Sequence, residues 1–288
     1  MKSQIDNLQE ALELLKQGMF ELIDHSRILR FESDPSADVV FKTPEFYWDV
    51  PTLKEQEIQT ELKKNYIRWI QLFKMIIEDA PENVRAKMIE IDSFIMNWIE
   101  KGSDWELPGT LKEAKTKFED NINPIFDTLT EYFNAEDGSV ILIPDTRAMI
   151  SNLNPLAYKE CIQQEKFTLA ILPAVLRELD ELKMKSWDEE FRKKVRTAVK
   201  RLKRFENRGN LHKGITFQRT IRIKLFPVEP DFTKASKWLD EEDNEDRIIA
   251  GAIEVQRTNP SDIVMLASAD SNLQNKAEMA YFPYVKFE

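Results

Sequence analysis

The chain has 288 residues, of which 42% are hydrophobic and 32% charged while only 7 are glycine, a composition that excludes a disordered or fibrous protein and favours a helix-rich globular one. The formal net charge of −10 argues against a protein that coats nucleic acid by bulk attraction. No run of about 18 apolar residues is present and the N-terminus lacks an apolar leader, so neither a membrane span nor secretion is expected, and a cytoplasmic location is predicted.

Residues 1–135 carry helical patterns and are predicted to form an all-α bundle. Apolar residues from Ile5 to Leu29 recur at spacings of three and four, which indicates a helix over 5–29. The apolar stripe is wider than a coiled-coil seam, so packing inside a bundle is favoured, while a homo-oligomer or a protein partner through these helices stays open. Further helices are predicted over 53–80, 81–101 and 110–133, the last interrupted at Pro124.

An aromatic-rich segment, residues 32–52, lies between the predicted helices 5–29 and 53–80. Its prolines and its four aromatic residues (Phe41, Phe46, Tyr47 and Trp48) predict a structured loop rather than a linker. One interpretation is a recognition loop that offers aromatic rings to a base or a partner. The favoured interpretation is that the loop caps the helical bundle, because aromatic side chains more often pack inside.

Residues 136–288 alternate between strand and helix patterns and are predicted to form a separate α/β domain with a central, mostly parallel sheet. The buried run Ser139–Ile143 is typical of a central strand. Residues 215–225 alternate between apolar and polar, which favours a half-exposed strand or hairpin. The other predicted strands are 167–172, 262–267 and 284–287, and the predicted helices lie near 155–165 and over 174–184, 188–206, 245–257 and 272–280.

Four acidic residues occur where these predicted elements meet: Asp145, Glu178, Asp246 and Asp270. All four can converge at one end of a parallel sheet, where chemistry in α/β proteins is usually found. The single cysteine excludes a cysteine-based zinc site, and a Ser/His/Asp set is not expected because neither His25 nor His212 has a glycine-flanked nucleophile near it. A cluster of carboxylates alone suits a hard cation, Mg²⁺ or Mn²⁺. Taken singly, Glu178 also fits a solvated helix face, Asp243 and Asp246 fit ordinary acids at a helix N-terminus, and Asp270 fits a helix cap.

Four motifs carry a resemblance to a known family. They are Ile143-Pro-Asp-Thr146, Val175–Lys183, Asp243–Ala252 and Val264–Leu273, and in this order and spacing they resemble the motifs of the PIN domain, a metal-dependent ribonuclease family. The resemblance covers roughly residues 138–288. It implies a three-layer PIN-like fold, with a helical bundle preceding it here.

The resemblance also implies an activity and a set of site residues. The protein would hydrolyse RNA phosphodiester bonds with Mg²⁺ or Mn²⁺, leaving 5′-phosphate and 3′-hydroxyl ends. The alternative is a PIN-like domain that no longer cuts and serves as an RNA-binding or assembly module. By the resemblance Asp145, Glu178, Asp246 and Asp270 hold the metal, Asp243 is an auxiliary ligand, Ser268 orients Asp270 or the water, and Arg147, which stands where many members have Asn, contacts the phosphate or pairs with an acid.

A basic segment lies inside this acidic chain. Residues 183–224 contain fifteen Lys and Arg against four acids. In the predicted helix 188–206, basic residues surround an apolar stripe, and such a face suits a phosphate backbone, although a solubilising surface explains it too. The predicted substrate is RNA, with single-stranded DNA as an alternative, and the predicted contacts are Arg192, Lys193, Arg196 and Lys200.

Overall fold

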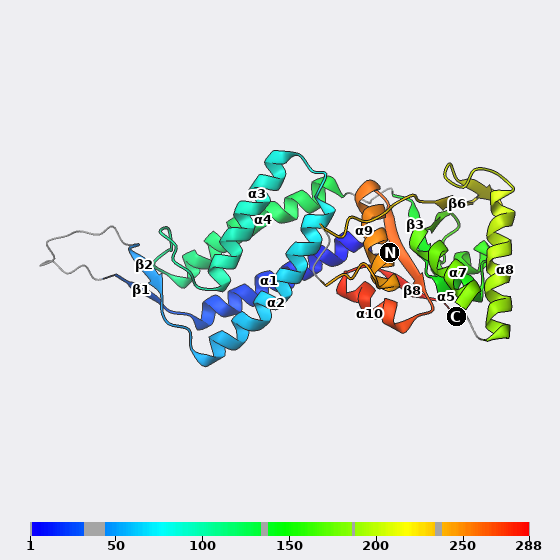
Figure 1. Cartoon of the computed structure of the whole chain (residues 1–288). Helices are drawn as coiled ribbons and strands as arrows, with labels where there is room; N and C mark the ends of the chain where they lie inside the picture. Colours follow the sequence, from blue (N-terminus) through cyan, green and yellow to red (C-terminus); the bar gives the residue numbers. More distant parts are fainter. Residues whose placement is uncertain (1, 32–43, 134–137, 186–187, 234–237, 288) are drawn as a thin grey trace, which may run out of the picture. The chain divides into compact units, whose positions relative to one another are not determined.

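The structure is a computed structural model that describes residues 2–31, 44–133, 138–185, 188–233 and 238–287 (Figure 1). The chain forms two compact units, one made of residues 1–8 and 132–288 and the other of residues 9–131. Throughout the described ranges, no helix is long and apolar enough to cross a membrane.

Residues 9–131 form the predicted helical bundle. Its helices are α1 (Gln4–His25), α2 (Leu53–Ile76), α3 (Glu82–Ile99) and α4 (Leu111–Tyr132), of which α1 begins in the other unit. The core is built from large side chains that are fully buried, among them Trp69, Phe73, Trp98 and Phe118. Because each helix is apolar on one side only, the bundle is the arrangement that removes those sides from water.

Two predictions for this unit were wrong in detail. The first helix ends at His25, and Ile28–Arg30 instead form a strand, β1, that pairs antiparallel with β2 (Phe46–Trp48). Leu29 is therefore an exposed strand residue and not part of the apolar seam. Helix α4 runs through Pro124 without interruption, because a single proline removes one hydrogen bond while the rest of the helix stays packed.

The described part of the aromatic segment packs against the helical bundle, in agreement with the favoured interpretation. The Trp48 ring is buried and packs edge-on against Trp98, with ring centroids 5.6 Å apart. A Cβ atom added at Gly109 would come within 2.8 Å of the Phe46 ring, so a glycine is needed there for close packing. Tyr47 is exposed, and Phe41 lies outside the described residues.

A buried ion pair ties two helices of the bundle together. Thr52 and Glu55 form a capping box at the start of α2, in which Thr52 N–H donates to Glu55 Oε2 at 2.6 Å. Glu55 also pairs with Lys101, which follows α3, and both side chains are 3% exposed. Burial opposes ionisation of the Glu55 carboxyl, but hydrogen bonds from Lys101 and Thr52 outweigh it and lower its pKa to about 2.

We predict that Lys101→Met lowers the free energy of unfolding by about 3–5 kcal/mol at pH 7, because it leaves a buried carboxylate without its partner. Glu55 contributes stability above its ordinary pKa of 4.5, and this contribution is lost as the pH falls towards about 2, so the deficit of the variant should shrink over that range. Urea unfolding followed by tryptophan fluorescence measures it. The control is Lys63→Met, whose pair with Glu100 is about half exposed and worth less than about 1 kcal/mol. Equal losses from both variants would contradict the prediction.

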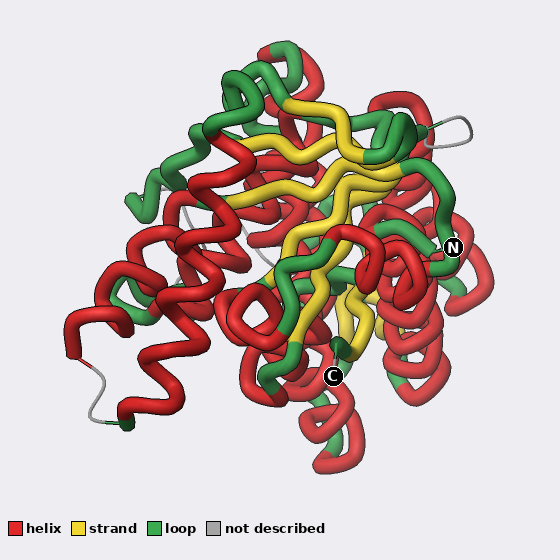
Figure 2. Tube along the Cα trace, turned by 90° about the vertical axis from the view of Figure 1, so that its right-hand side faces the viewer, coloured by secondary structure: helices red, strands yellow, loops and turns green. Residues whose placement is uncertain are grey.

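The other unit is a mixed α/β structure around one six-stranded sheet, as predicted. The strand order is β5-β6-β4-β3-β7-β8, and every neighbouring pair is parallel except β5 and β6. Figure 2 shows the twisted sheet with helices on both sides. The strands are β3 (Val140–Pro144), β4 (Phe167–Ile171), β5 (Ile215–Phe217), β6 (Ile221–Leu225), β7 (Ile263–Ser268) and β8 (Tyr284–Lys286).

The sheet places residues that are far apart in sequence beside one another. Strand β3 is buried along its whole length, as expected for a central strand, and its Pro144 lies beside Ala267 of β7. Strand β6 is half-exposed as predicted, yet it pairs with a strand on each side. The helices are α5 (Thr146–Ser151), which was not predicted, α6 (Pro155–Ile162), α7 (Pro173–Lys185), α8 (Glu189–Glu206), α9 (Asn244–Thr258) and α10 (Ser271–Met279).

The first turn of α1 belongs to this α/β unit. Gln4, which is fully buried, donates from Nε2 to the carbonyl of Ala280 at 2.9 Å, and Asn7 Nδ2 donates to the carbonyl of Tyr281 at 3.0 Å. These two amides satisfy carbonyls at the end of α10 that have no partner inside the helix. A fragment that starts at residue 136 would therefore lose two hydrogen bonds at the end of this helix.

Candidate active site

Asp145 lies at the junction of β3 and α5, and its carboxylate is held by three donors. It is the N-cap of α5 and accepts from Ala148 N–H at 2.5 Å. Its second oxygen accepts from Ser268 Oγ at 2.5 Å and from Ala269 N–H at 3.1 Å. The Asp145 N–H donates to the carbonyl of Ala267, so pairing with β7 aligns the main chain as well. The residue is buried and its orientation is set by the register of β3 and β7.

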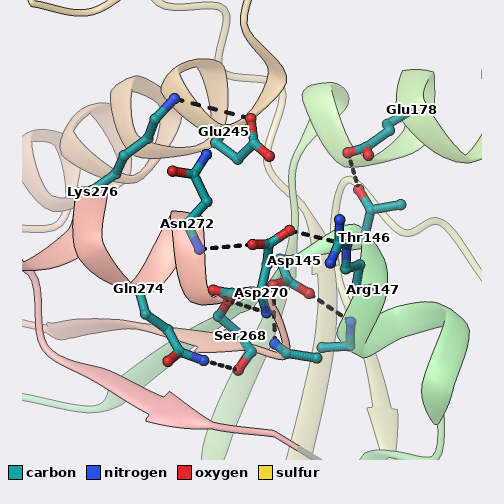
Figure 3. A network of polar contacts seen from close by, with 12 residues as sticks. Asp145, Thr146, Arg147, Glu178, Glu245, Ser268, Asp270, Asn272, Gln274 and Lys276 are labelled. Carbon is teal, nitrogen blue, oxygen red and sulfur yellow. Dashed lines mark hydrogen bonds and ion pairs between the residues drawn. The ribbon is translucent and has the colours of Figure 1, made fainter.

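Ser268 joins Asp145 to Asp270. It donates to Asp145 and accepts from the N–H of Asp270 at 3.0 Å, so one hydroxyl orients both acids (Figure 3). Asp270 is the N-cap of α10 and accepts from Asn272 N–H at 2.8 Å. The helix-cap interpretation of Asp270 is thus confirmed, and Asp145 is a helix cap as well. Both caps are compatible with a site, because each uses one carboxylate oxygen.

Glu178 completes an acidic group with these two residues. It extends from α7 and accepts from Thr146 Oγ1 at 2.6 Å (Figure 3). Burial raises the pKa of Glu178 above its ordinary value, and the charges of Asp145 and Asp270 raise it further, against the opposing effects of Thr146 and Arg147. Burial likewise raises the pKa of Asp145, with an added contribution from Asp270. The three carboxylates lie close enough to repel one another.

Arg147 pairs with one of these acids. Its Nε lies 3.0 Å from Asp270 Oδ2, and its side chain is 65% exposed. Two roles were predicted for Arg147, contact with a phosphate or pairing with an acid. In the structure Arg147 pairs with an acid. An ion pair this exposed is weak, so Arg147 is held only loosely at the rim of the acidic group.

The remaining acids of the predicted set form a second group around Lys276. Asp243 is the N-cap of α9 and accepts from Asp246 N–H at 3.0 Å. Lys276 Nζ, from α10, lies 2.7 Å from Asp243 Oδ1 and 2.9 Å from Asp246 Oδ1. Burial opposes ionisation of Asp243, but hydrogen bonds from Lys276 and from the Asp246 N–H lower its pKa to about 2. Both groups are therefore neutralised in part, this one by the mostly buried Lys276 and the first by the mostly exposed Arg147.

Sequence reasoning missed Lys276, Thr146 and Gln274. Gln274 Nε2 donates to the carbonyl of Ser268 at 3.0 Å and so anchors α10 against β7. Thr146 and Lys276 lie inside or beside the quoted motifs, but no periodicity or spacing marks a residue that bonds to an acid more than 30 positions away.

The donor set fits a hard cation. Within the part of the chain that the structure describes, no three acidic side chains converge closely enough as they stand to hold a metal ion together. Asp145, Glu178 and Asp270 nevertheless offer only oxygen donors, and their mutual repulsion is what a bound cation relieves. These three residues therefore suit Mg²⁺ or Mn²⁺ chemically.

Helix α8 carries the predicted basic residues and is a neighbour of two helices of this site. It packs against both α5 and α7, the helices that follow Asp145 and carry Glu178 (Figure 1). Val195, Ala198, Leu202 and Phe205 are buried, while Phe191 is only half-buried. Of the four predicted contacts, Lys193, Arg196 and Lys200 are exposed and Arg192 is half-buried.

The sequence was compared with protein families and with curated proteins. A family model described as PIN domain matches residues 142–288, about half of the chain. No curated protein matches it. The matched segment begins inside β3 and contains the acids of both groups.

Proposed function

This chain belongs to the PIN domain family, because the family model matches half of the residues of the chain, and from this we propose an activity. The protein is a Mg²⁺- or Mn²⁺-dependent endoribonuclease that hydrolyses RNA phosphodiester bonds. PIN domains are generally nucleases and typically use divalent metal ions. The observation that carries the proposal is the group of Asp145, Glu178 and Asp270, three mutually repelling carboxylates at the end of the central strands.

In this proposal each acid has a role at the site. Asp145, Glu178 and Asp270 hold the metal, and Asp246 and Asp243 form the second acidic group of the same site. When bound, the divalent ion supplies an activated water and neutralises charge that develops on the phosphate. Ser268 supports Asp145 and Asp270, and Thr146 supports Glu178, so each carboxylate has a hydrogen-bonded neighbour that orients it.

The basic side chains bind the substrate. Lys193, Arg196 and Lys200 on α8 attract the phosphate backbone without choosing a sequence, and Arg147 reaches outward from the acidic group. The proposed substrate is RNA held by its backbone, with single-stranded DNA as the alternative. A cytoplasmic location and the role of residues 136–288 as the nuclease domain belong to the same proposal.

The test is cleavage of a labelled mixed-sequence RNA by the full chain in Mn²⁺, in Mg²⁺ and in EDTA. We expect cutting that depends on the metal, products with 5′-phosphate and 3′-hydroxyl ends, and no cutting in EDTA. Cutting that persists in EDTA would contradict the proposal, as would products with cyclic phosphate ends.

A second candidate is favoured by one observation, the pairing of Arg147 with Asp270. A cation already beside the acid weakens the need for a metal, and the domain would then serve as an RNA-binding or assembly module that does not cut. In that case the full chain binds RNA in the presence of Mn²⁺ and leaves it intact.

Metal addition separates these candidates before any cleavage assay. We predict that Mn²⁺ raises the melting temperature of the α/β unit, because a ligand that binds only the folded state adds about 2.7 kcal/mol when its concentration is 100 times its Kd. Differential scanning calorimetry with Mn²⁺, with EDTA and with the monovalent control K⁺ measures the effect. An unchanged melting temperature in Mn²⁺ favours the module that does not cut.

A further inference from the structure

Lys276 lies where a divalent cation would be expected in an acidic site. Its ammonium is 2.7 Å from Asp243, 2.9 Å from Asp246 and 4.0 Å from Glu245, and its side chain is only 17% exposed. Figure 3 shows Lys276 beside Glu245, on the side of the network away from Glu178. One fixed positive charge thus faces three carboxylates at the start of α9.

Three oxygens of this second group already face a donor or the ammonium. Asp243 Oδ1 accepts from both the Lys276 ammonium and the Asp246 N–H. Asp246 uses Oδ2 for the N–H of Asp240 at 3.0 Å and directs Oδ1 to Lys276. A metal ion on the same oxygens would have to displace the ammonium, since two cations cannot share them at contact distance.

The lysine is held in place by the helix that carries Asp270. Asp270 caps the start of α10, Gln274 ties its first turns to the carbonyl of Ser268, and Lys276 follows on the same short helix. The position of the ammonium is therefore linked to the position of the first acidic group. This is a preorganised charge, which costs no reorganisation when substrate binds.

We propose that Lys276 takes the place of a second divalent ion, so that the protein binds one metal ion, at Asp145, Glu178 and Asp270. The inference rests on the proposed function and deepens it by setting how many ions the site holds. Lys276 acts as a positioning residue that keeps Asp243 and Asp246 together and away from the metal. Fixed positive charge from an ammonium supplies the neutralisation that a second ion gives in two-metal sites.

The experiment counts Mn²⁺ bound to the full chain by equilibrium dialysis and by electron paramagnetic resonance. We expect one ion per wild-type chain, a second ion in Lys276→Met, and one ion again in Lys276→Arg, which restores the charge. Asp246→Asn should leave Mn²⁺ affinity within about threefold of wild type, while Asp270→Asn lowers it by at least about tenfold. Circular dichroism checks that each variant is folded, and Lys286→Met, an exposed lysine of the same unit, is the matched control.

Each outcome decides something. Two ions in the wild type, or an Asp246→Asn chain that loses as much affinity as Asp270→Asn, overturns the inference and leaves the ribonuclease proposal standing. One ion bound without any RNA cleavage overturns the ribonuclease proposal and leaves the inference standing. No Mn²⁺ bound by the wild type overturns both. A Lys276→Met chain that still binds one ion also overturns the inference.

Discussion

Asp270→Asn is expected to lower the rate of RNA cleavage by at least about 100-fold while the melting temperature of the metal-free protein stays close to that of the wild type. The substitution removes a charge from the acidic group and keeps a carbonyl oxygen that can accept from Asn272 N–H, so the cap of α10 survives. The Arg147 side chain of the lost pair is 65% exposed, so the pair contributes little to stability.

Asp270 is a better test than Asp145, although Asp145 is the more buried of the two. Both oxygens of Asp145 accept hydrogen bonds, and the amide of an asparagine would direct an N–H group towards the Ala269 N–H. Asp145→Asn should therefore reduce cleavage and also stability, by about 1–3 kcal/mol. A loss of activity in Asp145→Asn alone would not distinguish the site from the fold.

The chain offers a matched control for Asp270. Asp188 caps α8 and accepts from Glu190 N–H at 2.9 Å, the same bond to the second residue on that Asp270 makes at 2.8 Å. Asp188→Asn removes an N-cap carboxylate of the same unit without touching the acidic group, so its cleavage rate should equal that of the wild type. Single-turnover cleavage in Mn²⁺ and thermal melting in EDTA are the two measurements. An Asp270→Asn chain as active as the Asp188→Asn control would refute the proposed site.

Replacing Lys193, Arg196 and Lys200 together by Gln is expected to weaken RNA binding by up to about 100-fold at 0.1 M salt. Each basic residue that neutralises a phosphate releases about 0.7 counterion from a single strand, so the loss of three contacts multiplies the dissociation constant by roughly that factor. The same change should make the slope of log affinity against log salt less negative by about 2. Arg192 is left in place because it is half-buried.

Binding is measured by fluorescence anisotropy in EDTA, where no cleavage is expected, at several salt concentrations. The matched control replaces Lys54, Lys64 and Lys87, three exposed lysines of the helical bundle, by Gln. Both triple variants lose the same net charge, so a difference between them reports position and not bulk electrostatics. Equal affinities and equal slopes for the two variants would show that α8 is a solubilising surface.

Local sequence patterns determined the elements and the residues that end them. The apolar run before Asp145 is a buried central strand, and the acids that follow β3 and β7, Asp145 and Asp270, are helix caps, because burial and capping act over a few neighbouring residues. The order of the four acids along the chain was also visible. The strand pair β1–β2 and helix α5 were not, since each is short and depends on its neighbours more than on its own propensity.

Only the tertiary structure decided which charges meet. Ser268 bonds to Asp145 across 123 positions, and Lys276 bonds to Asp243 across 33, while in the bundle Lys101 pairs with Glu55 across 46. These contacts follow from the register of β3 on β7, from the packing of α10 against α9, and from the end of α3 lying beside the start of α2. Periodicity within a segment carries no information about the register between segments. The acids could therefore be identified from the sequence, whereas the partner of each acid could be identified only from the tertiary structure.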